Sequence, residues 1–336
     1  MIEVTLSAVE AGRDLSMEQM SQAIGMIMEG DCSEDEIARL LVALHQKGET
    51  VAEIAGAAAA MRQHMTPIHT RQRDVLDVVG TGGDRSGTFN ISTAAALVVA
   101  AAGAPVAKHG NRRVTSPSGA ADVLAKLGVD VEADVPVVEA CLDELGICFC
   151  FAPLLHRAMR HVAPVRKKLG MPTIFNILGP LANPARAPFQ LLGVGRPELR
   201  PLLSEALALL GVRRVLVVHG SDGLDEVTLG GATYVTEATG QQFREFVWNP
   251  SDFGLQPAPR DSLLVDGPDQ SAAVIRDILD NRPGPPRDIV VANAAAALWT
   301  VGKDESLSAC ARLADEAIRS GAARDLLARL VQRTKQ

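Results

Sequence analysis

Two apolar runs, each followed by a polar loop and then by an alanine-rich run that ends at a glycine, fill residues 74–128. "DVLDVV" and "APVAKHG" have the character of buried strands, whereas "TAAALVVAAAG" and "SGAADVLAKLG" predict buried helices that end at Gly103 and Gly128. Further strands are expected in "ICFCF", "FQLLGVG", "RRVLVVHG" and "RDIVVANAAAAL". Strands that alternate with helices predict an α/β fold, with a mostly parallel central sheet flanked by helices.

The first seventy or so residues predict helices. "SMEQ", "SEDE" and "TVAE" begin at Ser16, Ser33 and Thr50 and match the capping box. In that motif a hydroxyl and an acid or amide three residues later satisfy the free amides of a helix start. Apolar residues within 37–44 then follow the spacing of one helix face.

The chain is therefore expected to divide into a small all-helical domain, residues 1–72, and a large α/β domain, residues 73–336. "PVRKKLGMPTIFNILGPLANP" interrupts the strand–helix alternation with prolines and glycines. We interpret it as a crossover, so that part of residues 164–190 joins the helical domain. Three short helices make a poor core of their own, and we expect them to pack on something else, such as a second subunit.

The net charge restricts the partners that the chain can have. The 336 residues carry a formal net charge of −7, with 47% hydrophobic and 22% charged residues. Nucleic acid and anionic membranes both require a basic excess, so a general role on either is disfavoured. Any phosphate that the protein binds is therefore expected to belong to a small molecule.

The cysteines and the N-terminus bear on location. Five cysteines show no disulfide-framework spacing, and Cys148 and Cys150 share one face of a predicted strand. We interpret this pair as small core residues in a reducing cytosol, and a metal site is the alternative. Neither a leader peptide nor a membrane-spanning apolar run is evident, so a cytoplasmic location is expected.

The stretch "GTGGDRSGTFNIST", residues 80–93, lies between a predicted strand and a predicted helix. In open parallel sheets, ligands bind outside the carboxyl ends of the strands. Glycines allow close approach, amides at the helix start point at an anion, and Thr88, Ser92 and Thr93 add hydroxyl donors. The spacing matches neither a dinucleotide fingerprint nor a P-loop. The alternatives are a phosphate-binding loop and a plain connector.

A second loop, "KHGNRRVTSPSG", follows the next strand in the same way. It carries the cations Lys108, Arg112 and Arg113 and several hydroxyls ahead of another helix. Two anion-binding loops at one sheet edge suit a ligand with phosphate at both ends. The alternative is a basic surface loop with solvated arginines.

Adjacent carboxylates occur in "HGSDGLDEVTL", at Asp225 and Glu226. Beside two phosphate loops they would repel the ligand unless a cation lay between them, and Mg²⁺ bridges carboxylate and phosphate oxygens. A plain acidic turn is the alternative. In "FAPLLHRAMRHVAPVRKKLG", Arg166 is suited to a bidentate pair with a substrate carboxylate, whereas His156 and His161 are weaker candidates.

In combination these motifs closely resemble the anthranilate phosphoribosyltransferase family. The resemblance runs from the helical N-terminus to about Ala297. It is carried by "GTGGD", "TFNIST", "KHGNR", "SG-x-AD-x-L-x-x-LG", "FAP…H…AM…V-x-PVR-x-x-LG", "TIFN-x-LGPL-x-NPA" and "VHG-x-DGLDE".

The resemblance implies an enzyme, a pentosyltransferase of tryptophan biosynthesis. It would transfer the phosphoribosyl group of phosphoribosyl pyrophosphate to the amine of anthranilate, with Mg²⁺, two ions per monomer. It also implies an α/β domain like that of pyrimidine nucleoside phosphorylases and a homodimer joined through the helical domains. Neither nucleic acid nor membrane is an expected partner.

The resemblance further assigns residues to each ligand, and none of them acts as a general base. The donor would contact Gly80, Gly83, Asp84, Thr88, Asn90, Ile91, Ser92, Thr93, Lys108, His109, Gly110, Asn111, Arg112, Arg113, Val114, Thr115, Ser116 and Ala120. Anthranilate would contact Gly80, His109, Asn111, His156, Arg166 and Pro180, with Arg166 as the orienting residue. The metal would be bound by Ser92, Asp225 and Glu226.

The chain departs from the family pattern at several positions. Arg85 replaces a usual glycine, and Ala120 replaces a serine whose hydroxyl would face the donor. Leu154–Leu155 and Pro172 replace polar residues on the acceptor side. Three alternatives therefore stay open: a phosphoribosyltransferase for another aromatic amine, a nucleoside phosphorylase, and a non-catalytic nucleic-acid-binding paralogue on the same fold.

Overall fold

The computed structural model describes residues 2–83, 86–112 and 118–336. Within them, seven strands form one sheet in the order β3-β2-β1-β4-β5-β6-β7. Strands β1 to β5 are parallel, and β6 and β7 are antiparallel, so the predicted mostly parallel sheet is confirmed. The strands are β1 Leu76–Gly80, β2 Val106–Gly110, β3 Ile147–Phe151, β4 Phe189–Gly193, β5 Arg214–Gly220, β6 Thr233–Thr239 and β7 Gln242–Trp248.

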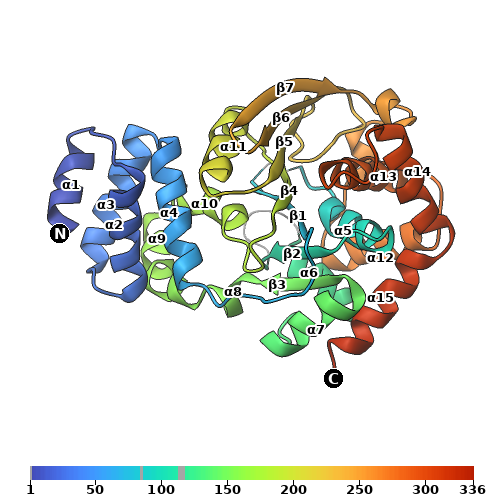
Figure 1. Ribbon diagram of the computed structural model, residues 1–336, viewed down its shortest axis with the longest axis horizontal. Coiled ribbons are helices and arrows are strands. Elements are labelled where there is room, and N and C mark those ends of the chain that lie inside the picture. The colour runs from blue at the N-terminus through green and yellow to red at the C-terminus, as the bar shows by residue number, and fades with distance from the viewer. Residues whose placement is uncertain (1, 84–85, 113–117) are drawn as a thin grey trace.

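Helices lie at both ends of the molecule and on both faces of the sheet (Figure 1). No helix in the described ranges is both long and apolar enough to cross a membrane. The α-helices are α1 Ile2–Glu10, α2 Met17–Glu29, α3 Glu34–Lys47, α4 Val51–His64, α5 Ile91–Ala101, α6 Ala120–Leu127, α7 Val135–Leu145, α8 Ala152–Leu155, α9 Ala163–Leu169, α10 Phe175–Leu178, α11 Leu199–Leu209, α12 Pro268–Leu279, α13 Pro285–Thr300, α14 Leu307–Arg319 and α15 Ala322–Arg333. The described part of the chain also has four 3₁₀ segments, η1 Arg157–His161, η2 Gly179–Leu181, η3 Pro250–Phe253 and η4 Arg260–Leu263.

The three predicted capping boxes are present. The side chains of Ser16, Ser33 and Thr50 each accept a hydrogen bond from the backbone N–H of the residue three positions later. The side chain of that later residue accepts from the backbone N–H of the cap residue. The helices that follow are α2, α3 and α4. Helix α1, which precedes them and packs on α3, was not anticipated.

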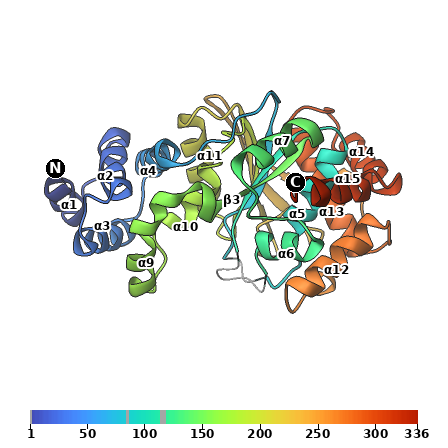
Figure 2. The same ribbon diagram turned by 90° about the horizontal axis from the view of Figure 1, so that it is seen from below.

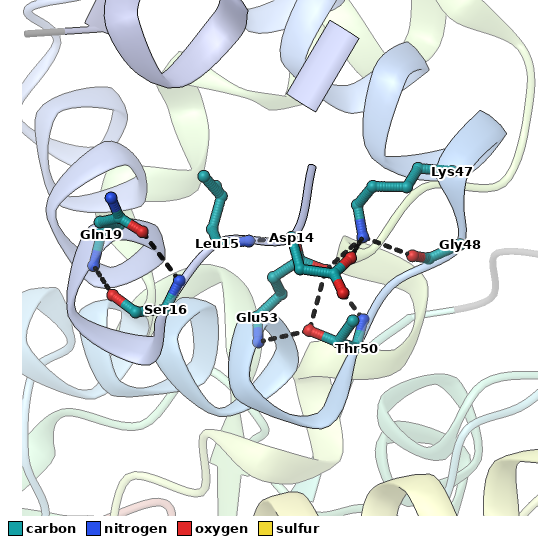
Figure 3. A network of polar contacts seen from close by, with 8 residues as sticks. All are labelled: Asp14, Leu15, Ser16, Gln19, Lys47, Gly48, Thr50 and Glu53. Atoms are coloured by element: carbon teal, nitrogen blue, oxygen red, sulfur yellow. Dashed lines mark hydrogen bonds and ion pairs between the residues drawn. The ribbon is translucent and has the colours of Figure 1, made fainter. Parts of the chain in front are cut away.

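Glu53, which is fully buried, joins three segments of the helical region. Its carboxylate accepts from Leu15 N at 3.0 Å, from Thr50 N at 2.8 Å and from Lys47 Nζ at 2.9 Å, and Lys47 also pairs with Asp14 (Figure 3). A buried charge is stable only when it is paired and hydrogen-bonded, and this one is. The network therefore fixes the α1–α2 loop to the turn between α3 and α4.

The two faces of the sheet belong to different apolar clusters. On β4, Leu191 packs in the cluster that contains α5 and α13, whereas Leu192 packs in the cluster that contains α2, α4 and α11. On β5, Leu216 and Val217 divide in the same way, because successive strand residues face opposite sides. The helical region thus shares a core with one face of the sheet.

The crossover segment runs beside the helical region. Helix α9 packs on α3 and α10 packs on α4, and η2 follows directly (Figure 2). The chain then enters β4. Residues 163–181 therefore lie between the N-terminal helices and the sheet.

One strand prediction was wrong. "RDIVVANAAAAL" lies in α13, which starts at Gly284–Pro285 and is buried on nearly all sides. An apolar run without helical periodicity is typical of a buried strand and also of a fully buried helix. The hairpin β6–β7 was not anticipated either, because Tyr234, Phe243 and Val247 leave its outer face partly apolar and blur the usual alternation.

Candidate active site

The strand order places a switch point at β1. From β1 the chain builds outward through β2 and β3, and then returns to place β4 on the other side of β1. Ligands of open α/β sheets bind at the carboxyl ends of the strands beside such a point. Here those ends are Gly80 of β1 and Gly193 of β4, which are paired in register, and Gly110 of β2.

A cavity of about 250 Å³ lies at this place. It is bounded by the first turn of α5, the glycine-rich loop, the end of β2, the start of α6 and the loop that follows β5. The lining residues are Val79, Gly80, Thr81, Gly82, Ser86, Gly87, Thr88, Phe89, Asn90, Ile91, Ser92, Lys108, His109, Gly110, Asn111, Arg112, Ser118, Gly119, Ala120, Asp225 and Glu226.

The acidic pair crosses the strand ends because two glycines admit it. A Cβ on Gly193 would lie 1.6 Å from the carbonyl oxygen of Asp225, and one on Gly80 would lie 2.5 Å from Asp225 Oδ2. Asp225 Oδ2 accepts from Gly82 N at 3.0 Å, and Glu226 Oε1 accepts from Ser92 N at 3.1 Å. Both carboxylates are therefore held at the cavity by backbone amides.

Lys108 lies buried beneath this pair. Its Nζ donates to Val78 O at 2.7 Å and to Ser92 Oγ at 3.2 Å. Burial lowers the pKa of Lys108, and the carboxylates of Asp77, Glu226 and Asp225 oppose that shift. The Lys108 side chain thus joins β1, through Val78, to the first turn of α5, through Ser92.

Asp77 is also buried, on β1. Its Oδ1 accepts from His109 N at 3.1 Å, and its Oδ2 has no hydrogen-bond partner among the described residues. Burial raises the pKa of Asp77 to about 6, against the lowering effect of the Asn183 amide and the Lys108 charge. Asp77 therefore links β1 to the β2 residue that enters the cavity.

Two histidines form a buried pair at the cavity edge. His109 Nδ1 lies 3.0 Å from Gly179 O, and His109 Nε2 lies 3.2 Å from His156 Nε2. Burial lowers the pKa of His109 to about 3, with the His156 ring adding to the effect, and burial lowers the pKa of His156 to about 4. Both rings are neutral at pH 7, so His109 gives the cavity a polar but uncharged surface, and His156 contacts it from behind the lining.

Arg112 lines the cavity but is held from the other side. Its guanidinium pairs with Glu132 at 2.6 Å and Asp122 at 3.6 Å, and it lies over the ring of Phe151 at 5.4 Å. Its charge is therefore shared between the cavity and two carboxylates.

Arg166 lies on α9, outside the set of cavity-lining residues. Its Nη2 donates to Asn176 Oδ1 at 3.3 Å and its guanidinium lies 5.8 Å from the centre of the Phe175 ring. Burial lowers its pKa. Pro180 is likewise outside the lining set, and its carbonyl accepts from Gln190 Nε2 at 2.7 Å. Through Gly179, the neighbour of Pro180, this segment contacts His109.

Ser92, Asp225 and Glu226 fit a magnesium site only in part. All three line the same cavity and present oxygen atoms, which Mg²⁺ prefers. The described residues contain no group of three or more carboxylate, histidine or cysteine side chains suited to hold a metal by themselves. A metal here would therefore need oxygens from a bound phosphate, as is usual for Mg²⁺ in phosphate-transfer sites.

Comparisons with known proteins identify the family. Residues 5–65 match the model described as "Glycosyl transferase family, helical bundle domain", and residues 72–324 match "Glycosyl transferase family, a/b domain". The anthranilate phosphoribosyltransferase of Rhodospirillum rubrum is 50% identical over 98% of this chain and 95% of its own length. That of Rhodopirellula baltica is 48% identical over 97% of this chain and 96% of its own length.

The chain belongs to the anthranilate phosphoribosyltransferase family.

Solved structures of the family agree with the fold. The anthranilate phosphoribosyltransferase of Thermus thermophilus superposes with a TM-score of 0.94, at 44% identity over 98% of this chain and 99% of that one. The Saccharomyces cerevisiae enzyme, in complex with PRPP and Mg, superposes with a TM-score of 0.90 at 30% identity, over 99% of this chain and 98% of that one. The expected small helical domain and large α/β domain of the family are both confirmed.

Most residues that the family resemblance assigned come together at the cavity. Those that line it are Gly80, Thr88, Asn90, Ile91, Ser92, Lys108, His109, Gly110, Asn111, Arg112, Ala120, Asp225 and Glu226. Those described but outside its lining are Gly83, Thr93, His156, Arg166 and Pro180. Asp84, Arg113, Val114, Thr115 and Ser116 lie outside the described residues.

Residues that support the candidate site were missed in the sequence. Gly193 admits Asp225, as described above. Asn293 of α13 fixes Val227, the residue after Glu226, by accepting from Val227 N and donating to Val227 O, both at 2.9 Å. Ser271 of α12 accepts from Asn90 N at 3.0 Å. None of the three carries a motif, since each acts through a contact distant in sequence.

Proposed function

We propose that the chain transfers the 5-phosphoribosyl group of phosphoribosyl pyrophosphate to the amine of anthranilate, giving N-(5-phosphoribosyl)anthranilate and pyrophosphate. One observation carries the proposal: the glycine-rich loop, the basic loop and the acidic pair meet at a single cavity. A doubly phosphorylated sugar needs such a combination of amides, cation and metal-binding carboxylates. The names of the relatives supply the acceptor.

The donor site follows from the first turn of α5. Amides at a helix start bind phosphate oxygens, and Thr88, Ser92 and Lys108 line the same cavity. Departure of pyrophosphate leaves positive charge on the sugar and negative charge on the leaving group. Mg²⁺ held by Ser92, Asp225 and Glu226, two ions per monomer in this proposal, would neutralise the leaving group. The chain's own donors bind and orient the diphosphate in a pre-formed site.

The acceptor side lies toward the crossover segment. Asn111 and His109 line the cavity there. Behind them His156 contacts His109, and Pro180 follows Gly179, whose carbonyl oxygen contacts His109. We assign Arg166 to the anthranilate carboxylate, which it would hold so that the amine faces C1 of the ribose. The amine nitrogen bonds to C1 as the bond from C1 to the pyrophosphate oxygen breaks, and the proton that the amine loses passes to pyrophosphate or water. In this proposal orientation of the amine, and not a general base, promotes the reaction.

The proposal extends to assembly and location. Helices α1 and α3 form an open groove of about 570 Å³ whose walls include Val9, Ala38, Val42 and Ala43, and Val4 nearby is exposed. We assign this face to a homodimer contact, which sedimentation would reveal as a mass of two chains that Val42→Asp reduces to one. We also propose a cytoplasmic place in tryptophan biosynthesis, which the proposed substrates and the five free cysteines support.

Rescue of a tryptophan-requiring bacterium that lacks this transferase tests the proposal. The wild-type chain should restore growth without tryptophan, and the double variant Asp225→Asn, Glu226→Gln should not. Failure of a well-expressed wild-type chain to rescue would favour another aromatic amine as acceptor, since Leu154, Leu155 and Pro172 depart from the family on that side. Salt-sensitive binding to single-stranded DNA without turnover would favour the nucleic-acid-binding alternative.

A further inference from the structure

A segment far along the chain forms backbone hydrogen bonds with the glycine-rich loop. Residues 263–265 run antiparallel to residues 87–89: Phe89 N donates to Leu263 O at 3.0 Å and Val265 N donates to Gly87 O at 2.9 Å. Thr88 and Leu264 form the bridge between them. Helix α12 starts three residues after this bridge ends.

A side chain of α12 makes the second contact with the glycine-rich loop. Ser271, which is fully buried, accepts from Asn90 N at 3.0 Å and donates to Asn90 Oδ1 at 3.4 Å. Asn90 is the residue before α5, yet its side chain makes no capping bond to that helix. Ser271 binds the backbone N–H of Asn90, and Glu226 binds the Ser92 amide that an N-cap side chain would usually bind. The Asn90 side chain is therefore left for another task.

That task is to join the two anion-binding loops. Asn90 Oδ1 accepts from Ser118 Oγ at 2.9 Å, and Asn90 Nδ2 lies 3.5 Å from Ser118 O. Asn90 ends the glycine-rich loop, and Ser118 ends the basic loop just before α6. Both residues line the cavity. One amide side chain thus sets the spacing between the walls that would grip the two phosphate ends of the donor.

Helix α12 also contacts α6, the helix that follows the basic loop. It packs on α6, Arg276 Nη2 donates to Lys126 O at 2.6 Å, and Lys126 pairs with Asp269 at 2.8 Å. Because α12 contacts Asn90 on one side and α6 on the other, it is a common support for both loops.

We propose that Ser271 is a positioning residue for the phosphoribosyl donor. It acts through Asn90 to fix the spacing between the two phosphate-binding loops. The inference rests on the proposed function. A positioning role differs from a purely structural role in its expected effect. Removal of the Ser271 hydroxyl should weaken donor binding and leave the acceptor site unchanged.

The test compares Ser271→Ala with a matched control. Ser204 of α11 is equally buried, and its hydroxyl donates to Pro201 O within its own helix, away from the cavity. Both variants lose one buried hydroxyl, so similar losses of thermal stability are expected. Calorimetric binding of phosphoribosyl pyrophosphate with Mg²⁺ should weaken about five- to tenfold in Ser271→Ala and less than twofold in Ser204→Ala. The KM for anthranilate should change less than twofold in both.

A double-mutant cycle isolates the route through Asn90. In an Asn90→Ala background, Ser271→Ala should weaken donor binding less than twofold further, because the partner is already absent. Ser271→Cys keeps a weak donor and acceptor and should give an intermediate Kd even if the alanine variant folds poorly. Equal Kd values for wild type and Ser271→Ala, or additive effects in the cycle, would overturn the inference alone. Wild-type protein that binds no donor would overturn the proposed function and this inference with it.

Discussion

The backbone N–H of Ser92 donates to Glu226 Oε1 at 3.1 Å, across 134 residues of sequence. A carboxylate thus occupies the first turn of α5, the place where a helix favours an anion. A diphosphate bound at the same turn would face that negative charge. A divalent cation between them would remove this conflict, which is why we propose Mg²⁺ at this position.

The first prediction concerns this carboxylate pair. Asp225→Asn with Glu226→Gln should lower kcat at saturating Mg²⁺ by at least about 100-fold, because the metal loses both charged ligands. Asp261→Asn, which neutralises an exposed carboxylate outside the cavity lining, should leave kcat unchanged. A Mg²⁺ titration of the initial rate measures both. An unchanged Mg²⁺ dependence in the double variant would remove these residues from the metal site.

The second prediction concerns the backbone beneath the pair. Gly193→Ala places a Cβ 1.6 Å from the Asp225 carbonyl oxygen, so the loop must move. We expect a loss of more than about 2 kcal/mol in the free energy of unfolding, together with weaker Mg²⁺ binding. Gly25→Ala in α2 meets only His64 at 3.8 Å and should be neutral or stabilising. Denaturant unfolding measures the free energy of unfolding of both variants. Equal values for Gly193→Ala and Gly25→Ala would show that the Asp225 loop moves without loss of stability.

The third prediction concerns the acceptor. Arg166→Ala should raise the KM for anthranilate about ten- to 100-fold, as expected for loss of a charged hydrogen bond, and leave donor binding within twofold. Lys167→Ala removes the neighbouring exposed charge on the same helix and serves as the control. Steady-state kinetics with each substrate varied separately measures the split. Equal losses for both substrates would refute the assignment of Arg166 to the carboxylate.

The fourth prediction concerns pH and the buried histidines. The pKa of His109 is lowered to about 3 and that of His156 to about 4, whereas the unfolded value is about 6.5. Below pH 6.5 both histidines therefore bind protons in the unfolded chain while they stay unprotonated in the folded chain. Each histidine should reduce the free energy of unfolding by about 1.4 kcal/mol per pH unit until its folded pKa is reached.

His156→Gln should therefore make stability fall less steeply between pH 6.5 and 4 than it does in the wild-type chain. The comparison with wild type cancels groups that His156 does not contact, such as Asp77, whose raised pKa acts in the opposite direction. Loss of the His156 ring also removes part of the lowering of the His109 pKa, which reduces the slope further. Urea unfolding at several pH values gives the two slopes. Parallel slopes would mean that His156 titrates alike in both states.

The fifth prediction concerns Ala120, which lines the cavity at the start of α6. Ala120→Ser restores a hydroxyl that the family pattern has at this position. One neutral hydrogen bond is worth about 1 kcal/mol, so the KM for the donor should fall by up to about fivefold. A KM equal to that of the wild type would show that the hydroxyl does not reach the donor.

The candidate site was more predictable than parts of the fold. Gly80 and Lys108 lie in the carboxyl-terminal parts of β1 and β2, and Asp225 lies in the loop after β5. Parallel strands bring such positions to one edge of the sheet whatever their distance in sequence. The capping boxes at Ser16, Ser33 and Thr50 were local signals, and all three are present.

Contacts set by tertiary packing left no such signal. The strand prediction for "RDIVVANAAAAL" was wrong because α13 is apolar on nearly every face, and with it Asn293 was missed as the support of Val227. The His109–His156 pair depends on how the short helix α8 turns the chain after β3, which no spacing in the sequence fixes.

The central claim is that one cavity holds a phosphoribosyl donor and passes its sugar to anthranilate. Anthranilate fluorescence, followed after phosphoribosyl pyrophosphate is added to the purified wild-type chain, tests it most directly. We predict a steady fluorescence loss that needs enzyme, donor and Mg²⁺ together and that disappears in the Asp225→Asn, Glu226→Gln variant. Constant fluorescence with all three components present would contradict the claim.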